Sequence, residues 1–431
     1  MLNKKFQNYS ISLVLLSLLS CNGGGGGGTF TPTVNKPQTQ NNNISTPSTP
    51  VPTKTPYLSV GNNPAPTKVF TEPVTEERNP DPNIQFASYN KLLRALPTSD
   101  FSYIQKEYDA GGLKVTAVKA ENDFADYPIN YGISSLIQNV GTYGLNNRLV
   151  LEMKVDERKN MIEKLLRHIL IYGARFTANR LSEFSKTTAS STNKKYTDEL
   201  AKYTGVYFYG NESKTISENS IAQMSQKIDA SNGTNTFSQI SSGINQLQSA
   251  DASDYKTIID AKNTIEKGLL KMLYIATLEK SALAIPDKKS SELDDAEAYY
   301  IGIREQAKSI DNIKTTKIEQ LLGARDFRVL NYPTLEKYLN AGFHEKAMNE
   351  MQNAINKVGN DDKTAQNSAL NAQLYLDVIN SPYQNSRFKR ATNNIIKDEM
   401  NTFLASINSK NKELAEISFS KIQSSATSLI K

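Results

Sequence analysis

Apolar residues recur at every third or fourth position along most of the chain after about residue 86, and this spacing constrains the fold more than any other feature. Side chains three and four residues apart share one face of an α-helix, so each such stripe predicts an amphipathic helix that buries that face. The three clearest stripes consist of Ile258, Ile265, Leu269, Met272, Leu273 and Ala276; of Leu335, Leu339, Phe343, Ala347, Met351 and Ile355; and of Phe388, Ile395, Phe403, Ile407, Leu414 and Ile417.

Prolines divide this part of the chain into helix-sized segments. Only five of the sixteen prolines lie after residue 85, and each is expected near a helix boundary, because proline lacks the amide hydrogen that a helix interior requires. Period-two alternation, which indicates a strand, is rare and is clearest at 113–118 (LKVTAV), so at most a short β-ribbon is expected. The sequence therefore predicts an all-α, multi-helix bundle over residues 86–431.

Residues 21–85 have a composition that does not support a folded core. Six consecutive glycines follow Asn22, and the segment holds eleven of the sixteen prolines together with many Thr, Asn and Gln residues. Such a segment buries too little apolar surface to offset the loss of chain entropy, so we expect a disordered tether. A flexible coil of about 64 residues has a root-mean-square span of roughly 45 Å. That span would hold the helical domain clear of a membrane surface.

Residues 1–20 have the features of a lipoprotein signal peptide. A pair of lysines precedes the apolar stretch 11–19, which is shorter than the about 20 residues that span a bilayer. The stretch leads into Leu-Leu-Ser-Cys, and Cys21 is the only cysteine in 431 residues. A lipid attachment point is favoured over an ordinary signal peptide with an incidental cysteine. We expect the Cys21 lipid to anchor the chain in the cell envelope, at the outer membrane facing the periplasm or the cell surface.

The composition excludes several classes of function. A single cysteine allows no intramolecular disulfide, no CxxC redox pair and no cysteine-based zinc site. There are two histidines and no tryptophan, and we find no glycine-rich phosphate loop. No nucleophile–base pair is evident, so we do not expect an enzyme. The net charge of +6 falls by two when Lys4 and Lys5 are removed with the signal peptide. The basic cluster 387–390 more readily covers a helix surface than binds phosphate, so no nucleic-acid partner is expected.

Carboxylates and tyrosines gather in residues 294–302 (DDAEAYYIG). On a helix, Asp294, Glu297 and Tyr300 follow one another at intervals of three residues and lie close to one face. This spacing brings two carboxylates and a phenol together. These oxygen donors suit hard cations. The preceding apolar stripe carries two more acids, and the short connection through Pro286 predicts antiparallel packing of the two helices. The candidate metal ligands are Glu266, Glu279, Asp294, Asp295, Glu297, Tyr300 and His168.

The same residues allow structural explanations. Acids that follow Ser291 suit the first turn of a helix, where the helix dipole favours negative charge. Lys267, Lys271 and Arg304 are near enough in sequence to neutralise the acids, which would remove the need for a metal. His168 lies on an apolar stripe and is equally explained as a core histidine. Both sets of explanations remain open at this stage.

An internal similarity links two parts of the helical domain. Residues 162–166 resemble 265–269, and residues 198–203 resemble 294–299 in the order of acidic and aromatic residues. The two offsets differ by seven residues, which is about two helical turns. This similarity suggests two related helical halves.

The segment 294–302 resembles the "D-E-x-x-A-[FY]-Y-x-G" segment of the iron-assimilating, high-CO2-inducible (low-iron-inducible) periplasmic proteins of green algae and their bacterial relatives. Residues 100–113, 323–327 (GARDF) and 335–355 resemble other stretches of that family in the same order. The resemblance implies extracytoplasmic iron binding or delivery, with iron as the ligand and an iron-uptake protein as a partner. The chain differs at Glu297, where the algal proteins often carry an aromatic residue, and it lacks the cysteines for their disulfide framework.

Two functions from different classes follow. The first is an envelope lipoprotein that binds iron through carboxylate and tyrosine oxygens. The second is a helical scaffold or adhesin-type interaction lipoprotein without a metal. The first requires the acids to converge on one cleft, whereas the second leaves them apart.

We predict that Cys21→Ser abolishes membrane retention, because it removes the sulfur to which the lipid is attached. Detergent-phase partitioning of the expressed mutant and wild-type chains measures this. Equal partitioning of the two chains would contradict the lipoprotein assignment.

Overall fold

The computed structural model describes residues 81–123, 128–187, 191–308, 311–379 and 390–430. The predicted leader, Cys21, nearly all of the tether, Pro382 and Phe388 lie outside the described residues. The described part is helical apart from one two-stranded ribbon, so the all-α prediction is confirmed. It belongs to one compact unit, Val74–Lys431.

The first half of the domain contains eight helices and the ribbon. The elements in chain order are α1 (Pro82–Ala95), a 3-10 turn (Leu96–Thr98), α2 (Phe101–Ala110), α3 (Leu113–Asp123), α4 (Ile129–Gln138), β1 (Thr142–Tyr143), β2 (Arg148–Leu149), a second 3-10 turn (Val150–Glu152), α5 (Val155–Thr187), α6 (Ser191–Tyr209), α7 (Ile221–Asn232) and α8 (Thr236–Ser249). The ribbon is antiparallel, with Thr142 paired to Leu149.

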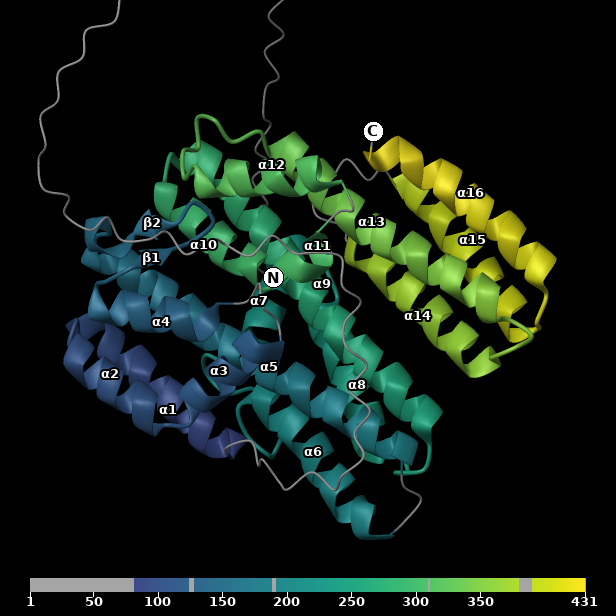
Figure 1. The fold of residues 1–431 in the computed structure, drawn as a ribbon, viewed down its shortest axis with the longest axis horizontal. Helices are drawn as coiled ribbons and strands as arrows, with labels where there is room; N and C mark the ends of the chain where they lie inside the picture. The colour runs from purple at the N-terminus through teal and green to yellow at the C-terminus, as the bar shows by residue number, and fades with distance from the viewer. Residues whose placement is uncertain (1–80, 124–127, 188–190, 309–310, 380–389, 431) are drawn as a thin grey trace, which may run out of the picture. The chain divides into compact units, whose positions relative to one another are not determined.

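The second half contains eight described helices. In chain order they are α9 (Tyr255–Asp287), α10 (Ser290–Ile301), α11 (Arg304–Ala307), α12 (Asn312–Gly323), α13 (Tyr332–Lys357), α14 (Asp362–Ile379), α15 (Arg390–Asn408) and α16 (Lys412–Ile430). Helices α13 to α16 lie side by side (Figure 1). Within the described residues, no helix is both long enough and apolar enough to cross a bilayer.

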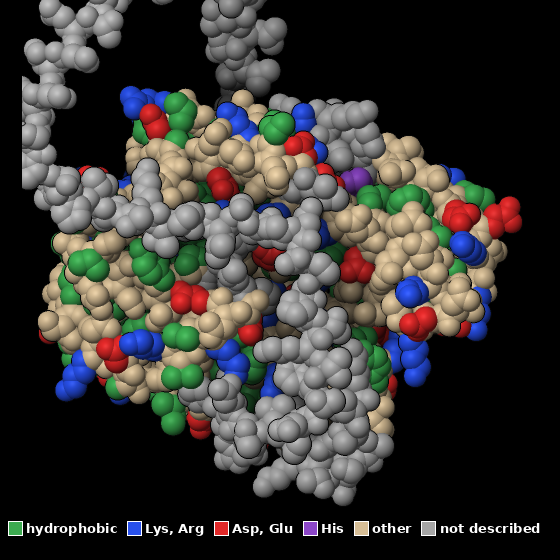
Figure 2. Space-filling view, in the orientation of Figure 1, with side chains coloured by type: hydrophobic (Ala, Val, Ile, Leu, Met, Phe, Trp, Pro, Cys, Tyr) green, Lys and Arg blue, Asp and Glu red, His purple; other side chains and the backbone are tan. Residues whose placement is uncertain are grey.

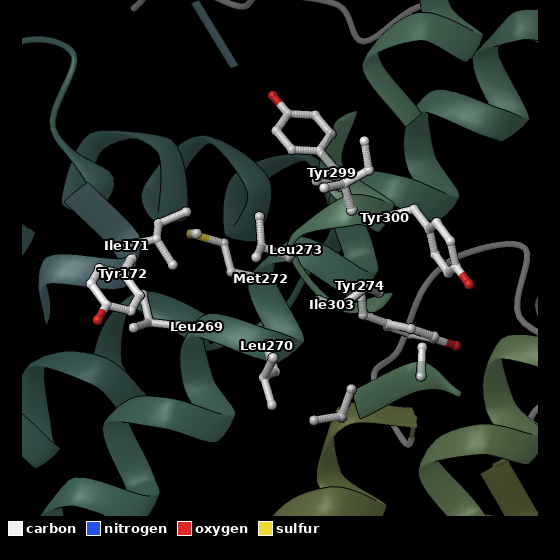
Figure 3. Close-up of a cluster of buried hydrophobic side chains, with 14 of the residues drawn as sticks. Ile171, Tyr172, Leu269, Leu270, Met272, Leu273, Tyr274, Tyr299, Tyr300 and Ile303 are labelled. Atoms are coloured by element: carbon white, nitrogen blue, oxygen red, sulfur yellow. The ribbon is translucent and has the colours of Figure 1, made fainter. Parts of the chain in front are cut away.

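Helix α9 lies at the centre of the packing. It contacts α5, α8, α10 and α14, and the stripe predicted for it is buried at every position. The stripe predicted for α13 is buried as well. Figure 3 shows part of the core, where Leu269, Met272 and Leu273 of α9 lie among side chains from α5 and α10. The periodicity of the sequence therefore identified the two faces that hold the core together.

The prediction for the C-terminal stripe is partly wrong. Ile395, Leu414 and Ile417 are exposed, whereas Phe403 and Ile407 are buried as expected. On α15, which packs against both α14 and α16, Ile396 is buried in place of Ile395. The residues that replace the predicted ones in the core are Ile396, Met400, Ala415 and Ile422.

Residues 113–118, the best candidate for a strand in the sequence, form the first half of helix α3 instead. Leu113, Thr116 and Ala117 are buried, while Val115 and Val118 are exposed. Burial of the first, fourth and fifth residues of this segment is a helical pattern. The alternating valines had suggested a strand instead. Packing against α1, α4 and α5 decides the outcome.

The internal similarity falls on two pairs of packed helices. Residues 162–166 and 198–203 lie on α5 and α6, and residues 265–269 and 294–299 lie on α9 and α10. The first helix of each pair is 33 residues long. The environments of the acids differ, because Asp198 is exposed and Asp294 is buried.

Charged side chains of both signs are interspersed over the face of the molecule drawn in Figure 2. Several of the described charged residues form pairs along one helix, such as Lys256 with Asp260 at 2.6 Å. Exposed pairs of this kind contribute little to stability. The surface charge of this face is mixed, as the alternation of Lys and Glu in the sequence indicates.

The folded domain begins a few residues earlier than expected. Asp81 caps helix α1 by accepting a hydrogen bond from the amide of Asn83 at 2.9 Å. Gln85 is fully buried and donates to Thr116 at 2.9 Å, and Phe86 is buried beside it. Residues 81–85, which we expected to belong to the tether, therefore contribute to the core.

We predict that a fragment of residues 79–431 melts at the same temperature as the lipid-free chain 21–431, whereas a fragment of residues 88–431 melts several degrees lower. The shorter fragment lacks the Phe86 side chain, whose removal from a core costs about 3–5 kcal/mol. It also leaves Thr116 without its partner. Circular dichroism melts of the three proteins test this, and equal melting temperatures would show that the first turn of α1 is not needed.

Candidate functional site

Helix α10 carries four of the predicted metal ligands. It starts at Ser290 after a two-residue turn in which Lys288 has a φ of 52°, and its residues from Leu293 to Ile301 are all buried. It packs against α9, α5 and α12, and the predicted packing against α9 is confirmed. Of its acids only Glu292 lies in the first turn, so the dipole explanation does not account for Asp294.

Asp294 is 1% exposed and accepts a hydrogen bond from Nε of Arg325. Arg325 lies just after α12 with a φ of 51°, and its Nη2 is also 3.5 Å from Oε1 of Glu157. Burial raises the pKa of Asp294 to about 8, and the carboxylates of Glu297 and Glu157 add to this effect. Arg148 favours the charged form of Asp294, but desolvation and the neighbouring acids outweigh it.

Glu297 joins helix α10 to the loop between β1 and β2. Its Oε1 accepts a hydrogen bond from the amide of Leu145. Burial raises the pKa of Glu297 to about 7, although the Leu145 amide and Arg148 oppose the rise. Gly144 has a φ of +86°, and a Cβ atom there would lie 2.5 Å from Oε1 of Glu297. Only glycine therefore permits this close approach of the loop to the carboxylate.

Arg148 completes the cluster. Its Nη2 is 2.7 Å from Oε2 of Glu157, and its buried Nη1 has no acceptor among the described residues. Arg148, Glu297 and Arg325 line a cavity of about 10 Å³, which has room for about one water molecule. The two arginines link this space to the other acids, because Arg325 contacts Asp294 and Glu157 and Arg148 contacts Glu157. We call Asp294, Glu297, Glu157, Arg148 and Arg325 the α10 cluster.

Asp295 lies in a different environment from Asp294. It accepts a hydrogen bond from the side-chain amide of Asn160 on α5. The ammonium groups of Lys164 and Lys280 are 3.7 and 3.3 Å from its two oxygens. Lys280 is also 2.8 Å from Glu292. Asp295 therefore ties α10 to α5 and α9 through cations of both helices.

Glu266 on α9 is surrounded by three basic side chains. Its oxygens lie 3.1 Å from Arg175, 3.2 Å from Lys262 and 3.4 Å from Lys267. Burial alone would raise the pKa of Glu266, but these cations hold it well below its ordinary value. The Lys267 ammonium also lies 4.3 Å from the ring centre of Tyr375. Glu266 is thus a permanently charged member of an interior ion-pair network.

The remaining predicted ligands lie elsewhere. Glu279 borders a separate groove, and burial raises its pKa. Tyr300 is fully buried, and its ring points away from that of Tyr299 (Figure 3). His168 is 1% exposed and packs against Gly302, where a Cβ would lie 2.3 Å from its ring. Burial lowers the pKa of His168 to about 3, so the imidazole is neutral, as expected of a core histidine.

The predicted metal ligands therefore do not converge on one cleft. Asp294 and Glu297 share the α10 cluster, and the other acids each have separate partners. Within the described ranges, no group of three or more His, Cys, Asp or Glu side chains is arranged to hold a metal ion.

The expectation that nearby cations neutralise the acids holds for Lys267, which lies 3.4 Å from Glu266. It does not hold for Lys271, which pairs with Asp377 at 2.9 Å, or for Arg304, which pairs with Glu319 at 2.7 Å.

Sequence reasoning missed three members of the α10 cluster. Arg325 lies in the stretch GARDF, which resembles the algal family but carries no ligand-type pattern of its own. Arg148 and Glu157 lie in no motif. They reach the cluster because the ribbon and the first turn of α5 fold back onto α10, and no local pattern encodes that contact.

We predict that the free energy of unfolding falls between pH 5 and pH 8. Asp294→Asn should reduce this fall by roughly 2–4 kcal/mol, because each unit of pKa shift corresponds to about 1.4 kcal/mol. In this range the folded chain keeps a proton on Asp294 that the unfolded chain has lost, so rising pH favours unfolding. Glu297→Gln should reduce the fall for the same reason, over a range ending near pH 7.

Urea unfolding at pH 5 and pH 8 measures these differences. Glu413→Gln, which alters an exposed acid on α16, serves as the control and should leave the fall unchanged. The same fall in wild type and Asp294→Asn would contradict a raised pKa at Asp294.

No protein-family model matches this chain, and no curated protein or solved structure matches it either. Its function is therefore inferred from its own residues.

Proposed function

We propose that this chain is a lipid-anchored protein of the cell envelope whose helical domain is an interaction scaffold. In this proposal Cys21 carries the lipid and the tether holds the domain away from the membrane. The observation that carries the proposal is the pairing of the predicted metal ligands with arginines and lysines. Asp294 contacts Arg325, Asp295 lies between two lysines, and Glu266 lies among three cations.

Charge balance gives these acids a structural role. A buried carboxylate is costly unless it is paired, and its pair fixes the relative position of the two helices that supply it. The Asp294–Arg325 pair fixes the loop after α12 on α10, and the Glu266–Arg175 pair fixes α5 on α9. A metal ion at either carboxylate would first have to displace its guanidinium. The acids therefore support a rigid domain more directly than they support metal transport.

Iron binding is a second candidate, supported by one observation. The pKa values of Asp294 and Glu297 are raised to about 8 and 7, so protons occupy these carboxylates near neutral pH. A hard cation would replace the protons and relieve the repulsion among the three acids of the α10 cluster. Asn146 and the backbone near the small cavity would supply further oxygens. In this candidate function, the family resemblance of residues 294–302 would reflect iron delivery to an uptake protein.

Thermal melts of the lipid-free chain with ferrous or ferric iron distinguish the two functions. The scaffold proposal predicts a melting temperature that does not respond to either ion. The comparison proteins are Asp294→Asn/Asp295→Asn and Glu297→Gln, with Glu413→Gln as the control. An increase of several degrees in wild type and in the control, absent from the other variants, would overturn the scaffold proposal in favour of iron binding.

A further inference from the structure

A groove of about 310 Å³ lies on another side of α10 from the α10 cluster. Its walls come from α7 and α9, with Arg167 of α5 and Tyr299 of α10 completing them. Its volume is at the lower end of the range for small-molecule sites, which are about 300–1,000 Å³. A groove of this size accommodates a metabolite of a few carbon atoms, and not a peptide segment.

One part of the groove is apolar. Met224 and Ile228 project from α7, and Ala276 and Leu283 project from α9. Leu283 is 38% exposed, so this apolar part reaches the surface. Side chains with hydroxyl or amide groups surround it, namely Asn219, Ser220, Gln223 and Ser231. An apolar wall beside a few polar groups is the usual composition of a site for a small organic molecule.

Arg167 supplies a fixed positive charge to the groove. Its Nη2 is 3.1 Å from Glu163, its Nη1 lies 3.7 Å from the sulfur of Met224, and the side chain also interacts with the Tyr89 hydroxyl. Its buried Nε has no acceptor among the described residues. A guanidinium has five N–H donors, and a thioether is a weak acceptor. The side chain therefore retains hydrogen-bonding capacity that a ligand carboxylate would use, as arginine and carboxylate geometries match.

The other charged residues of the groove differ in their availability. Lys280 is held by Glu292 and Asp295, so its charge is already balanced. Lys227 is exposed at the rim of the groove and is free to turn towards a bound anion. Glu279 lines the α9 wall and adds one acidic group to the groove. The groove thus presents two cations from α5 and α7, and one acid from α9.

We propose that this groove binds a small carboxylate with a branched aliphatic body, of the size of an aliphatic amino acid. The carboxylate pairs with Arg167 and Lys227, and the aliphatic body covers Met224, Ile228 and Leu283. An α-ammonium group, where the ligand has one, faces Glu279. This inference does not depend on the scaffold function or on iron, since none of the α10-cluster residues lines the groove.

Isothermal titration calorimetry of the lipid-free full-length chain tests the proposal with three probes. The probes are leucine, 4-methylpentanoate, which is leucine without its ammonium group, and inorganic phosphate. We expect at least one of the two carboxylates to bind, and phosphate to bind at least tenfold more weakly. Binding of leucine alone, together with its loss in Glu279→Gln, would establish the amino acid as the ligand class. Binding of both carboxylates would leave Glu279 outside the contact.

Variants locate the binding in the groove. Lys227→Gln and Arg167→Gln should each weaken carboxylate binding by about tenfold, as expected for about 1.4 kcal/mol. Arg328→Gln and Lys256→Gln remove exposed charges elsewhere and should bind as wild type does. Arg167→Gln also breaks the pair with Glu163, so Ser231→Trp provides a second test by filling the groove without removing a charge. The proposal is overturned if neither carboxylate binds, if phosphate binds as tightly, or if Lys227→Gln and Ser231→Trp bind like wild type.

Discussion

The burial of helix α9 along most of its length governs the arrangement of the helices around it. Its apolar stripe is buried at every position, yet the same helix carries Glu266, Lys267 and Lys271 into the interior. A buried charge without a partner destabilises a protein by about 3–5 kcal/mol. The neighbouring helices must therefore supply counter-charges at fixed positions. Arg175 of α5 pairs with Glu266, and Asp377 of α14 pairs with Lys271. Hydrophobic burial draws these helices together, and the charge pairs fix how they meet.

Helix α10 extends the same principle towards the ribbon and α12. Its acids point in at least two directions, so one short helix connects to several elements through ion pairs and one backbone amide. The pair between Asp294 and Arg325 brings in the loop after α12, and the bond from Leu145 to Glu297 brings in the ribbon. Crowding of three acids in the α10 cluster makes this connection sensitive to pH, because protons and arginines compete to balance the same carboxylates.

The two functional proposals use different parts of the molecule. The scaffold proposal rests on acids that are already neutralised, which removes the main reason to assign them to a metal. The groove beside α7 has the opposite character, since Arg167 there has donors that the protein satisfies only in part. In the proposed arrangement, a lipid and a tether hold the domain outside the cytoplasm, where it would meet small solutes and partner proteins. Rigidity from the ion pairs would keep such a groove open.

The sequence by itself determined the helical class of the domain and most of its buried faces, because burial of one helix face leaves a three- and four-residue periodicity that is readable locally. It also indicated that α9 and α10 pack together, since their connection is short. Only the tertiary structure decided that residues 113–118 form a helix, that Ile396 is buried on α15 while Ile395 is exposed, and that the acids separate into different pairs. The partners of those acids, such as Arg325 for Asp294 and Arg175 for Glu266, come from distant parts of the chain. Such contacts are chosen by how whole helices pack, and no short sequence pattern records that choice.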